Sequence, residues 1–596
     1  MSYKAPVKDL LFNMKHLANI EAVAQLPGFE DAGLDTAQAV LEECAKFNED
    51  VIAPLNVAGD LQPSSWKDGV VTTTPGFKEA FKQYAEGGWQ GLQHAPEFGG
   101  QGLPKTIGAA CQEILNSANL SFALCPLLTD GAIEALVTAG SDELKATYLD
   151  KLISGQWTGT MNLTEPQAGS DLALVRSRAE PQPDGCYKVF GTKIFITYGE
   201  HDMAENIIHL VLARVQGAPE GVKGISLFVV PKFLVNADGS LGARNDAHCV
   251  SIEHKLGIKA SPTAVLQFGD NGGATGYLVG EENRGLEYMF IMMNAARYAV
   301  GLQGISVSER SYQQAVAYAR ERVQSRPVDG SVKGSATIIH HPDVRRMLMT
   351  MRALIEGTRA TAITAAAAYD AAHKHPDAQV RQDNQTFYEF MVPLVKGYST
   401  EISQEVTALG VQVHGGMGFI EETGSAQHYR DCKILTIYEG TTAIQANDLV
   451  GRKTGRDGGA VAKAIAAQIE QTEAQLSALG GEPAQAVARE LALARQAFLD
   501  VVDYMVANGR ENPNAAYAGS VPYLMLAGNL VAGWNLGRAL LVASAQLSQG
   551  EDKAFYEAKI TTAHFYAEHI LPRTAALRSA IVNGGHSVME LPMDAF

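Results

Sequence analysis

The chain has 596 residues, 46% of them hydrophobic, and a single hydrophobic core stops growing at about 250–300 residues, so at least two domains are expected. A formal net charge of −17 argues against extended binding to nucleic acid, because no basic stripe is available to neutralise a phosphate backbone. The six cysteines are widely spaced and include no CxxC pair, which favours neither a zinc site nor a disulfide framework.

The first residues carry neither a basic region followed by an apolar run nor an Arg-rich, acid-poor pattern, so a cytoplasmic protein is expected.

One uncharged stretch, 512–537, has to be tested as a membrane span. Prolines and asparagines interrupt it, and its continuous apolar part falls short of the ~20 residues that cross a bilayer. We therefore expect no membrane span, and instead a buried helix at a domain or subunit interface.

The N-terminal region is predicted to be helical. Apolar residues recur at three-to-four spacing over 35–47, 75–87 and 107–118, and the glycines and prolines of 96–104 predict a loop. From about residue 158 the period changes to two. Segments rich in β-branched and aromatic residues then predict strands at 187–190, 207–213 and 225–230, with a turn at 183–185.

Long helical patterns return from Glu287, over 317–323, 344–369 and 387–409. A Gly-rich, charged linker at 451–459 precedes an Ala-rich helical run. This order indicates a multidomain α+β fold, in which a cofactor can be buried between layers. The predicted parts are an N-terminal extension (1–34), a helical domain (35–158), a β-domain (159–280), a helical bundle (281–450) and an additional helical domain (460–596).

Four segments carry residues suited to binding and chemistry: TMNLTEPQAGSD (160–171), GTKIFIT (191–197), QVHGGMG (412–418) and RDCKILTIYEGTTAIQ (430–445). In this order and spacing they resemble the acyl-CoA dehydrogenase family, and the last segment is the most specific of them. The long C-terminal extension resembles the subgroup that includes long-chain enzymes and 3-methylmercaptopropionyl-CoA dehydrogenases. The resemblance implies an FAD-dependent enzyme of fatty acid β-oxidation that passes electrons from an acyl-CoA to an electron-transfer flavoprotein.

Glu439 is the predicted catalytic base. Removing the α-proton of a thioester at neutral pH needs a base within hydrogen-bond reach, and donors aimed at the enolate oxygen, in a dry site. A carboxylate desolvated between flavin and substrate has a raised pKa, which increases its basicity. Gly440 leaves room for the substrate, and Thr442 to Gln445 has the form of a capping box that would fix the loop. By the resemblance, the backbone N–H of Glu439 and a ribityl hydroxyl of FAD donate to the oxyanion.

The resemblance also implies which residues hold FAD. Phe195 would pack on the flavin and Thr197 would bond near N5, and strand alternation points both side chains the same way. The cofactor residues implied in full are Met161, Leu163, Thr164, Gly169, Ser170, Phe195, Thr197, Arg322, Gln412, Gly415, Gly416, Thr441 and Gln445, and the substrate residues are Ser170, Arg297, Tyr438 and Gly440.

Arg322 and Gln412 would reach the FAD of a neighbouring subunit, which predicts a homodimer. The chain departs from the family at Ser325-Arg326, where Phe-Gly is usual, so the adenine end of FAD could be held differently. His414 is expected to be a structural neighbour of this turn. No metal site is expected, because the histidines at 340–341 and 373–375 sit at breaks rather than on an HExxH helix.

Several alternatives stay open at this point. The substrate could be a medium-to-long fatty acyl-CoA or 3-(methylthio)propanoyl-CoA, since side-chain volumes that set chain length cannot be placed from sequence. An acyl-CoA oxidase would use the same base and flavin but pass electrons to oxygen. A further reading, from another class, is an FAD-binding scaffold or a nucleic-acid-associated member without dehydrogenase activity.

Overall fold

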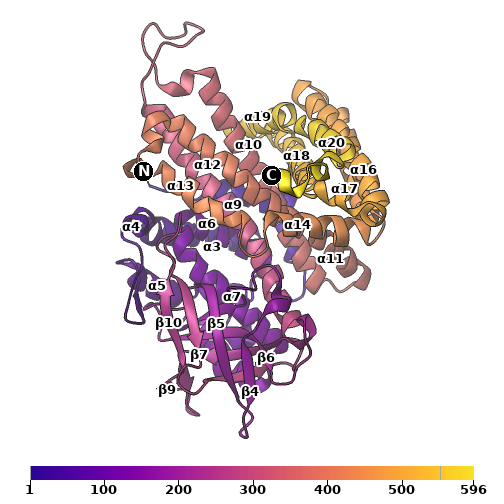
Figure 1. The fold of residues 1–596 in the computed structure, drawn as a ribbon. Helices are drawn as coiled ribbons and strands as arrows, with labels where there is room; N and C mark the ends of the chain where they lie inside the picture. Colours follow the sequence, from indigo (N-terminus) through magenta and orange to yellow (C-terminus); the bar gives the residue numbers. More distant parts are fainter. Residues whose placement is uncertain (1, 551) are drawn as a thin grey trace. The chain divides into compact units, whose positions relative to one another are not determined.

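The computed structural model describes residues 2–550 and 552–596, which form two compact units (Figure 1). The helical unit is built from Met1–Lys46, Pro104–Ser117 and Val300–Phe596, and the β unit from Phe47–Leu103 and Ala118–Ala299. Helix α9 (Gly285–Glu321) begins in the β unit and ends in the helical unit. Sequence periodicity over 317–323 therefore marks only the last part of this long helix.

The β unit contains an eight-stranded sheet of order β10-β11-β5-β12-β7-β6-β3, with β4 pairing β5 and β6. Neighbours are antiparallel, except that β3 and β4 each run parallel to β6. The predicted turn at 183–185 joins β4 to β5 as an antiparallel hairpin. The strands of this sheet are β3 (Trp157–Asn162), β4 (Arg178–Pro181), β5 (Tyr187–Thr197), β6 (Asn206–Val215), β7 (Ser226–Pro231), β10 (Ala247–Ile252), β11 (Thr263–Phe268) and β12 (Ala274–Val279).

Two small hairpins and four longer helices complete the β unit. The hairpins pair β1 (Ser65–Lys67) with β2 (Val70–Thr72), and β8 (Phe233–Val235) with β9 (Leu241–Arg244). The helices are α4 (Leu55–Leu61), α5 (Phe77–Glu86), α7 (Leu120–Ala139) and α8 (Asp142–Ile153). Helices α3 (Leu34–Phe47), α5 and α6 (Lys105–Ala118) confirm the three helices predicted from periodicity in the N-terminal region.

Helix α7 packs directly on strand β3. A Cβ added at Gly159 would lie 2.4 Å from the Cβ of Ala132, so this close approach requires glycine. The contact belongs to an apolar core that also includes Leu136 and Ile208. By length and hydropathy α7 is the one described helix that could cross a membrane, but 83% of its apolar stretch is buried inside the structure. Helix α7 is therefore apolar on all its faces because it is a core helix.

The helical unit is built mainly from helices, both short and long. They are α1 (Val7–Phe12), α2 (Ile20–Val23), α3 (Leu34–Phe47), α6 (Lys105–Ala118), α10 (Pro342–Lys374), α11 (Ala378–Pro393), α12 (Ser399–His414), α13 (Ser425–Cys432), α14 (Thr442–Asp448), α15 (Ala460–Leu479), α16 (Glu482–Glu511), α17 (Pro513–Ala518), α18 (Ser520–Ser548), α19 (Lys553–His569) and α20 (Arg573–Gly584). The helix predicted over 387–409 is confirmed as a continuous helical segment, with one change in its hydrogen-bond pattern. Pro393 lacks a backbone donor, and a π-helical turn, η8 (Leu394–Tyr398), separates α11 from α12.

The region after residue 460 consists of α15 to α20, and it packs on the bundle within the same unit. Helix α18 is buried along most of its length and contacts both α10 of the bundle and α19 of the extension. The uncharged stretch tested as a membrane span thus comprises the short helix α17, which is partly exposed, and the buried first part of α18. The π-helical turn η8 also contacts α18, where the Tyr398 hydroxyl donates to Asn529 Oδ1 at 2.7 Å.

A buried charge network ties both ends of the chain to the bundle. Arg359 on α10 is 2% exposed, and its guanidinium donates to Asp9 (2.7 Å), Glu113 (2.6 and 2.8 Å) and Glu309 (2.7 Å). Lys559 on α19 donates to the other oxygen of Asp9 and to Glu356 at 2.8 Å. Buried charges are tolerated only when paired, so this network fixes α1 and α19 on α10.

Candidate active site

Strand β3 leads into the first predicted flavin-binding segment. Met161 is buried near the end of β3, and Leu163 and Thr164 follow in the loop. The backbone N–H of Ile194 donates to the carbonyl of Thr164 at 2.9 Å, and Lys193 Nζ donates to the carbonyl of Leu163 at 2.9 Å. These bonds bring the loop beside strand β5, so the structure places the first two predicted segments next to each other.

Glu165 and Lys193 hold this loop, and the sequence did not single them out. The Glu165 carboxylate accepts from Lys193 Nζ (2.8 Å), from the Ser177 hydroxyl (2.5 Å) and from the backbone N–H groups of Arg176 (2.7 Å) and Ser177 (3.0 Å). Burial raises the pKa of Glu165, but the lysine charge and these donors lower it further, to about 2. The available signal in the sequence was a lysine directly before the apolar run Ile194 to Ile196, and in the structure its side chain has 0% exposure.

Phe195 lies in the left-handed region, with φ of 59°, at a break in the pairing of β5 with β11. The bulge interrupts strand alternation, so the prediction that alternation points Phe195 and Thr197 the same way rests on a regularity that is absent here. Its ring is 59% exposed, which is unusual for a phenylalanine in a central strand. A strained conformation of this kind persists where the surroundings enforce it and is common at ligand sites.

The remaining predicted residues of the β unit differ in exposure. Ser170 is exposed, and a Cβ at Gly169 would meet nothing within 4 Å, so this loop leaves open space. Thr197 pairs with Thr263 on β11. Arg297 is buried within α9, at 7% exposure.

In the helical unit, the loop between η11 (Lys433–Thr436) and α14 carries Glu439. Glu439 has φ of 53° and Gly440 has φ of 89°, so two consecutive residues adopt left-handed conformations. For a non-glycine residue this costs about 1–3 kcal/mol. Lys396 Nζ donates to the carbonyls of Leu435 and Gly440, both at 2.7 Å. Each bond from a charged donor contributes about 1.5–3 kcal/mol, so the pair outweighs the strain.

Further bonds fix both sides of this loop. The Tyr438 hydroxyl donates to Gln303 Oε1, and the Thr442 hydroxyl donates to Glu401 Oε1 at 2.6 Å. The N-cap of α14 is Thr441, whose hydroxyl accepts from the Ile444 N–H at 3.2 Å. The predicted capping box beginning at Thr442 is therefore wrong by one residue, because Thr442 is already helical. The expected consequence, a loop that runs directly into a helix start, is confirmed.

Gln445 is fully buried, and among the described residues neither its amide nitrogen nor its amide oxygen has a hydrogen-bond partner. It packs beside Gly397 in η8, where an added Cβ would lie 3.2 Å from the Gln445 Cβ. Its contact with FAD remains a prediction.

The residues predicted to reach a neighbouring subunit are exposed. Arg322 follows the end of α9, Gln412 lies in the last turn of α12, and Gly415 and Gly416 form the turn after it. A Cβ at either glycine would meet nothing within 4 Å. His414 is buried, its Nδ1 lies 2.7 Å from the Gly410 carbonyl, and its ring packs on Tyr318, so it has a structural role.

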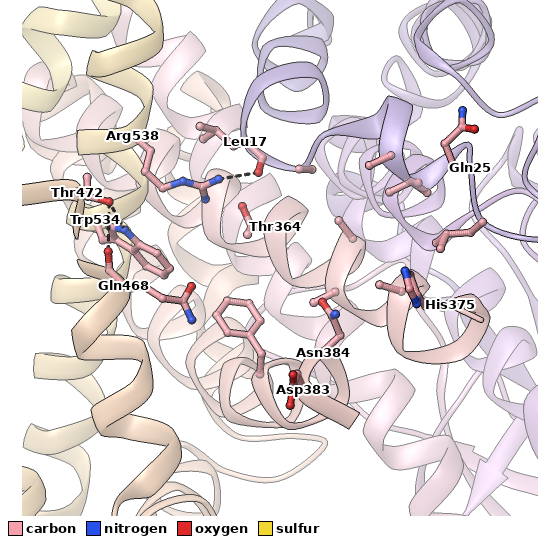
Figure 2. Close-up of a pocket in the computed structure, with 18 of the residues that line it drawn as sticks. Leu17, Gln25, Thr364, His375, Asp383, Asn384, Gln468, Thr472, Trp534 and Arg538 are labelled. Carbon is pink, nitrogen blue, oxygen red and sulfur yellow. Dashed lines mark hydrogen bonds between the residues drawn. The ribbon is translucent and has the colours of Figure 1, made fainter. Parts of the chain in front are cut away.

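A pocket of about 860 Å³ lies elsewhere in the helical unit (Figure 2). Arg538 donates to the Leu17 carbonyl at 2.8 Å, and Trp534 Nε1 donates to Thr472 at 2.9 Å. None of the predicted flavin or substrate residues lines this pocket. For this reason the pocket is not assigned to the candidate active site.

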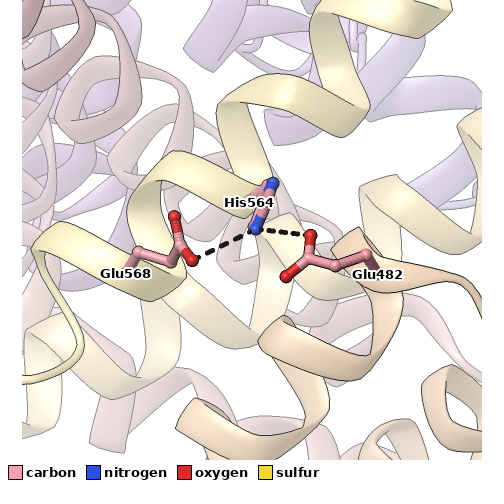
Figure 3. A group of neighbouring side chains, drawn as sticks. All are labelled: Glu482, His564 and Glu568. Carbon is pink, nitrogen blue, oxygen red and sulfur yellow. Dashed lines mark ion pairs between the residues drawn. The ribbon is translucent and has the colours of Figure 1, made fainter.

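His564, Glu482 and Glu568 form the one group of potential metal ligands found among the described residues (Figure 3). His564 Nε2 lies 3.1 Å from Glu482 and 3.4 Å from Glu568. Both carboxylates are exposed, so the group is explained as a surface ion-pair cluster between α16 and α19.

Four family models match successive parts of the chain. They describe an acyl-CoA dehydrogenase N-terminal domain (35–156), middle domain (160–271) and C-terminal domain (283–453), and an acetyl-CoA dehydrogenase C-terminal-like region (461–592). Their order defines the class of protein as a flavin-dependent dehydrogenase of acyl thioesters, with an extra C-terminal region.

Similar proteins narrow this class. The 3-methylmercaptopropionyl-CoA dehydrogenase of Ruegeria pomeroyi is 56% identical over 99% of both chains, and the broad-specificity linear acyl-CoA dehydrogenase FadE5 of Mycobacterium tuberculosis is 35% identical over 100% of both. The chain belongs to the acyl-CoA dehydrogenase family and is an FAD-dependent acyl-CoA dehydrogenase, as the motifs predicted.

Solved structures confirm the fold class. ACDH-11 of Caenorhabditis elegans, in complex with C11-CoA, superposes with a TM-score of 0.76 at 19% identity, covering 98% of this chain and 96% of that one. An acyl-CoA dehydrogenase of Bacillus anthracis complexed with FAD has a TM-score of 0.73 at 21% identity, covering 96% and 91%. The predicted order of helical, β, helical and additional helical parts along the chain is thus correct.

The residues present fit FAD. Phe195 offers an exposed aromatic face on a strained backbone, and the open space at Gly169, Gly415 and Gly416 permits close approach of a ligand to the main chain.

Proposed function

We propose that this chain oxidises an acyl-CoA to the trans-2-enoyl-CoA, with Glu439 as the base that removes the α-proton. The observation that carries this proposal is the left-handed conformation of Glu439, held by Lys396 and followed at once by the capped start of α14. Such strain at a single carboxylate, in a loop bonded on both sides, is typical of a residue whose position is set for chemistry.

In the proposed mechanism FAD supplies the acceptor for the hydride that leaves the β-carbon. Glu439 accepts the α-proton, and its own backbone N–H donates to the thioester oxygen as enolate charge develops. Gly440 has no side chain to obstruct the thioester. Phe195 and Thr197 would hold the flavin on the β unit, and Ser170, Arg297 and Tyr438 would contact the substrate.

For the acyl group we favour 3-(methylthio)propanoyl, because the relative that is 56% identical over the full chain is named for this substrate. The second candidate is a linear fatty acyl-CoA, and relatives of 32–35% identity named for butyryl-CoA or broad linear specificity support it. The 3-(methylthio)propanoyl group differs from pentanoyl, the linear acyl group of the same length, by a thioether sulfur in place of a methylene. A hydrophobic pocket separates such pairs by only about 1–3 kcal/mol.

A panel of acyl-CoA thioesters tests this choice. We expect kcat/KM for 3-(methylthio)propanoyl-CoA to exceed that for the isosteric pentanoyl-CoA, by about 10-fold or more, and to exceed those for octanoyl- and palmitoyl-CoA. Pentanoyl-CoA is the matched control for size. A maximum at octanoyl-CoA or longer would instead support a fatty acyl-CoA dehydrogenase.

The proposed electron acceptor is an electron-transfer flavoprotein. An oxidase would share Glu439 and FAD, so the acceptor has to be measured. After anaerobic reduction by substrate, the flavin should be reoxidised rapidly by the flavoprotein and slowly by air, whereas peroxide formation at the full turnover rate would identify an oxidase.

A scaffold without activity is disfavoured by the intact Glu439, and nucleic-acid binding by the charge of −17. A cytoplasmic location is part of this proposal.

We further propose a homodimer in which Arg322, Gln412 and the glycine turn of one subunit contact the FAD of the other. The region around this turn is apolar and exposed, with Phe419 86% exposed and Ile420, Met417 and Tyr429 about half exposed. Within its own chain, Gly416 has open space where a side chain would lie. We attribute the absence of a side chain at Gly416 to the FAD of the partner subunit, which would occupy this space.

Gly416→Ala tests the shared cofactor. Since no atom of its own chain obstructs the methyl group, the apoprotein should melt at the wild-type temperature. If FAD of the partner approaches this backbone, overpacking of about 1–3 kcal/mol should weaken FAD binding at least about fivefold. Gly509→Ala, also in open space but on α16, is the control. Wild-type FAD affinity in Gly416→Ala, or a tetramer by light scattering, would contradict the proposal.

A further inference from the structure

Lys396 is a fully buried lysine on the π-helical turn η8, forty-three residues before Glu439 in the chain. Its ammonium donates to two backbone carbonyls, Leu435 O and Gly440 O, each at 2.7 Å. One carbonyl precedes Glu439 and the other follows it. A single cation therefore closes the strained turn from both ends.

Each of the two carbonyls requires this donor for a different reason. Leu435 lies in the last turn of η11, where helix carbonyls lack a partner within the helix. The carbonyl of Ile434 already accepts from the N–H groups of both Ile437 (2.9 Å) and Tyr438 (3.1 Å). Gly440 adopts φ of 89°, which turns its carbonyl away from the direction it would have in a continuing helix. The ammonium of Lys396 satisfies both groups and joins η11 to the start of α14.

The geometry of η8 explains how this lysine reaches the loop. A π-helical turn widens the helix by one residue, and such turns are rare and concentrated at functional sites. Here the wide turn follows Pro393 directly and carries Lys396 on the side of α14, with Gly397 packed against Gln445. The π-helical turn within the helical segment 378–414 thus places the lysine next to the loop.

Resting on the proposed role of Glu439, we propose that Lys396 is a positioning residue for the reaction: its ammonium fixes the Glu439 turn so that the carboxylate and the backbone N–H of Glu439 face the thioester together. Lys396 need not touch substrate or flavin. Its effect is to hold one residue that supplies both the base and an oxyanion donor, and these two groups lose their alignment together when the turn relaxes.

Lys396→Met in the FAD-bound protein is the principal test, because methionine fills the buried volume and removes the donor. The rate of flavin reduction by substrate, measured anaerobically by stopped flow, should fall about 100-fold, as expected for a misplacement of about 1 Å. The dissociation constant of the acyl-CoA and the FAD content should stay at wild-type values. A lysine with a purely structural role would instead lower stability or FAD content and leave the reduction rate of the loaded enzyme unchanged.

A second measurement does not depend on activity. In the apoprotein, backbone amides of 433–442 should exchange with deuterium faster in Lys396→Met than in the wild type, with the β unit unchanged. Lys453→Met is the matched control: Lys453 also lies on a π-helical turn, η12 (Leu449–Gly455), is 20% exposed and faces Glu389 at 3.7 Å. It should change neither the exchange of 433–442 nor the rate of flavin reduction.

The double variant Lys396→Met/Glu439→Gln separates this inference from the proposed function. If Lys396 acts through Glu439, the double variant should reduce flavin no more slowly than Glu439→Gln alone. Wild-type reduction by Glu439→Gln would overturn the proposed function and this inference with it. An inactive Glu439→Gln beside a fully active Lys396→Met would overturn this inference alone. Should Lys396→Met fail to fold, Lys396→Gln, which keeps a neutral donor, is subjected to the same assays and the same criteria.

Discussion

Glu439→Gln is expected to bind FAD and acyl-CoA but to leave the flavin oxidised when substrate is added without air. The amide has nearly the shape of the carboxylate and cannot accept the α-proton, so the rate of flavin reduction should fall by at least about 10²–10⁴-fold, the usual contribution of a general base. The loss of the flavin absorbance near its visible maximum measures this directly. Because the backbone N–H that donates to the oxyanion is unchanged, binding of the enoyl-CoA product should persist.

Glu422→Gln provides the control, since Glu422 is an exposed carboxylate in the same unit without a role in the loop. It should reduce flavin at the wild-type rate. Bleaching of the flavin in Glu439→Gln at the same rate as in the wild type would show that another group is the base, and the substrate roles assigned to Tyr438 and Gly440 would then need revision as well.

Arg359→Met is expected to have the largest effect on stability. Its guanidinium neutralises Asp9, Glu113 and Glu309, and removing one side of a buried pair costs about 3–5 kcal/mol because uncompensated charge remains. Burial alone raises the pKa of Glu113, and the arginine charge opposes this effect. The variant should therefore melt well below the wild type or accumulate as aggregate, which a thermal melt followed by circular dichroism will show.

Arg346→Met lies on the same helix and loses only an exposed pair with Asp343, in which the side chains are 49% and 72% exposed. Such pairs contribute at most about 1 kcal/mol, so this control should melt close to the wild type. Equal melting temperatures for Arg359→Met and the wild type would show that the buried network is not needed for stability.

The fold class could be predicted from the sequence because it rests on local patterns. Apolar periodicity located α3, α5 and α6, and the change of period located the β-domain and its strands β5, β6 and β7. The segment around Glu439 identified the family without any coordinates. What it could not give was the backbone conformation of Glu439, which depends on bonds from η8 and α12 far away in the chain.

The predictions that failed did so where tertiary contacts override local rules. Thr441 caps α14 because Thr442 bonds Glu401, a residue about 40 positions earlier. The pairing of β5 with β11 contains a bulge at Phe195, so regular strand alternation does not hold there. Lys193 and Lys396 were missed because a lysine among apolar residues has no local signature of its acceptors, which here lie in other segments of the chain.

The bond between Asp9 and Lys559 joins residues 550 positions apart. At ribosomal rates of about 5–20 residues per second, the lysine is made roughly half a minute to two minutes after its partner. Helix α1 cannot reach its native electrostatic environment on the ribosome until α19 has left the exit tunnel. The bundle therefore matures only after translation is nearly complete, and a transcript truncated before α19 would yield a chain with Asp9 and Glu356 deprived of their shared cation.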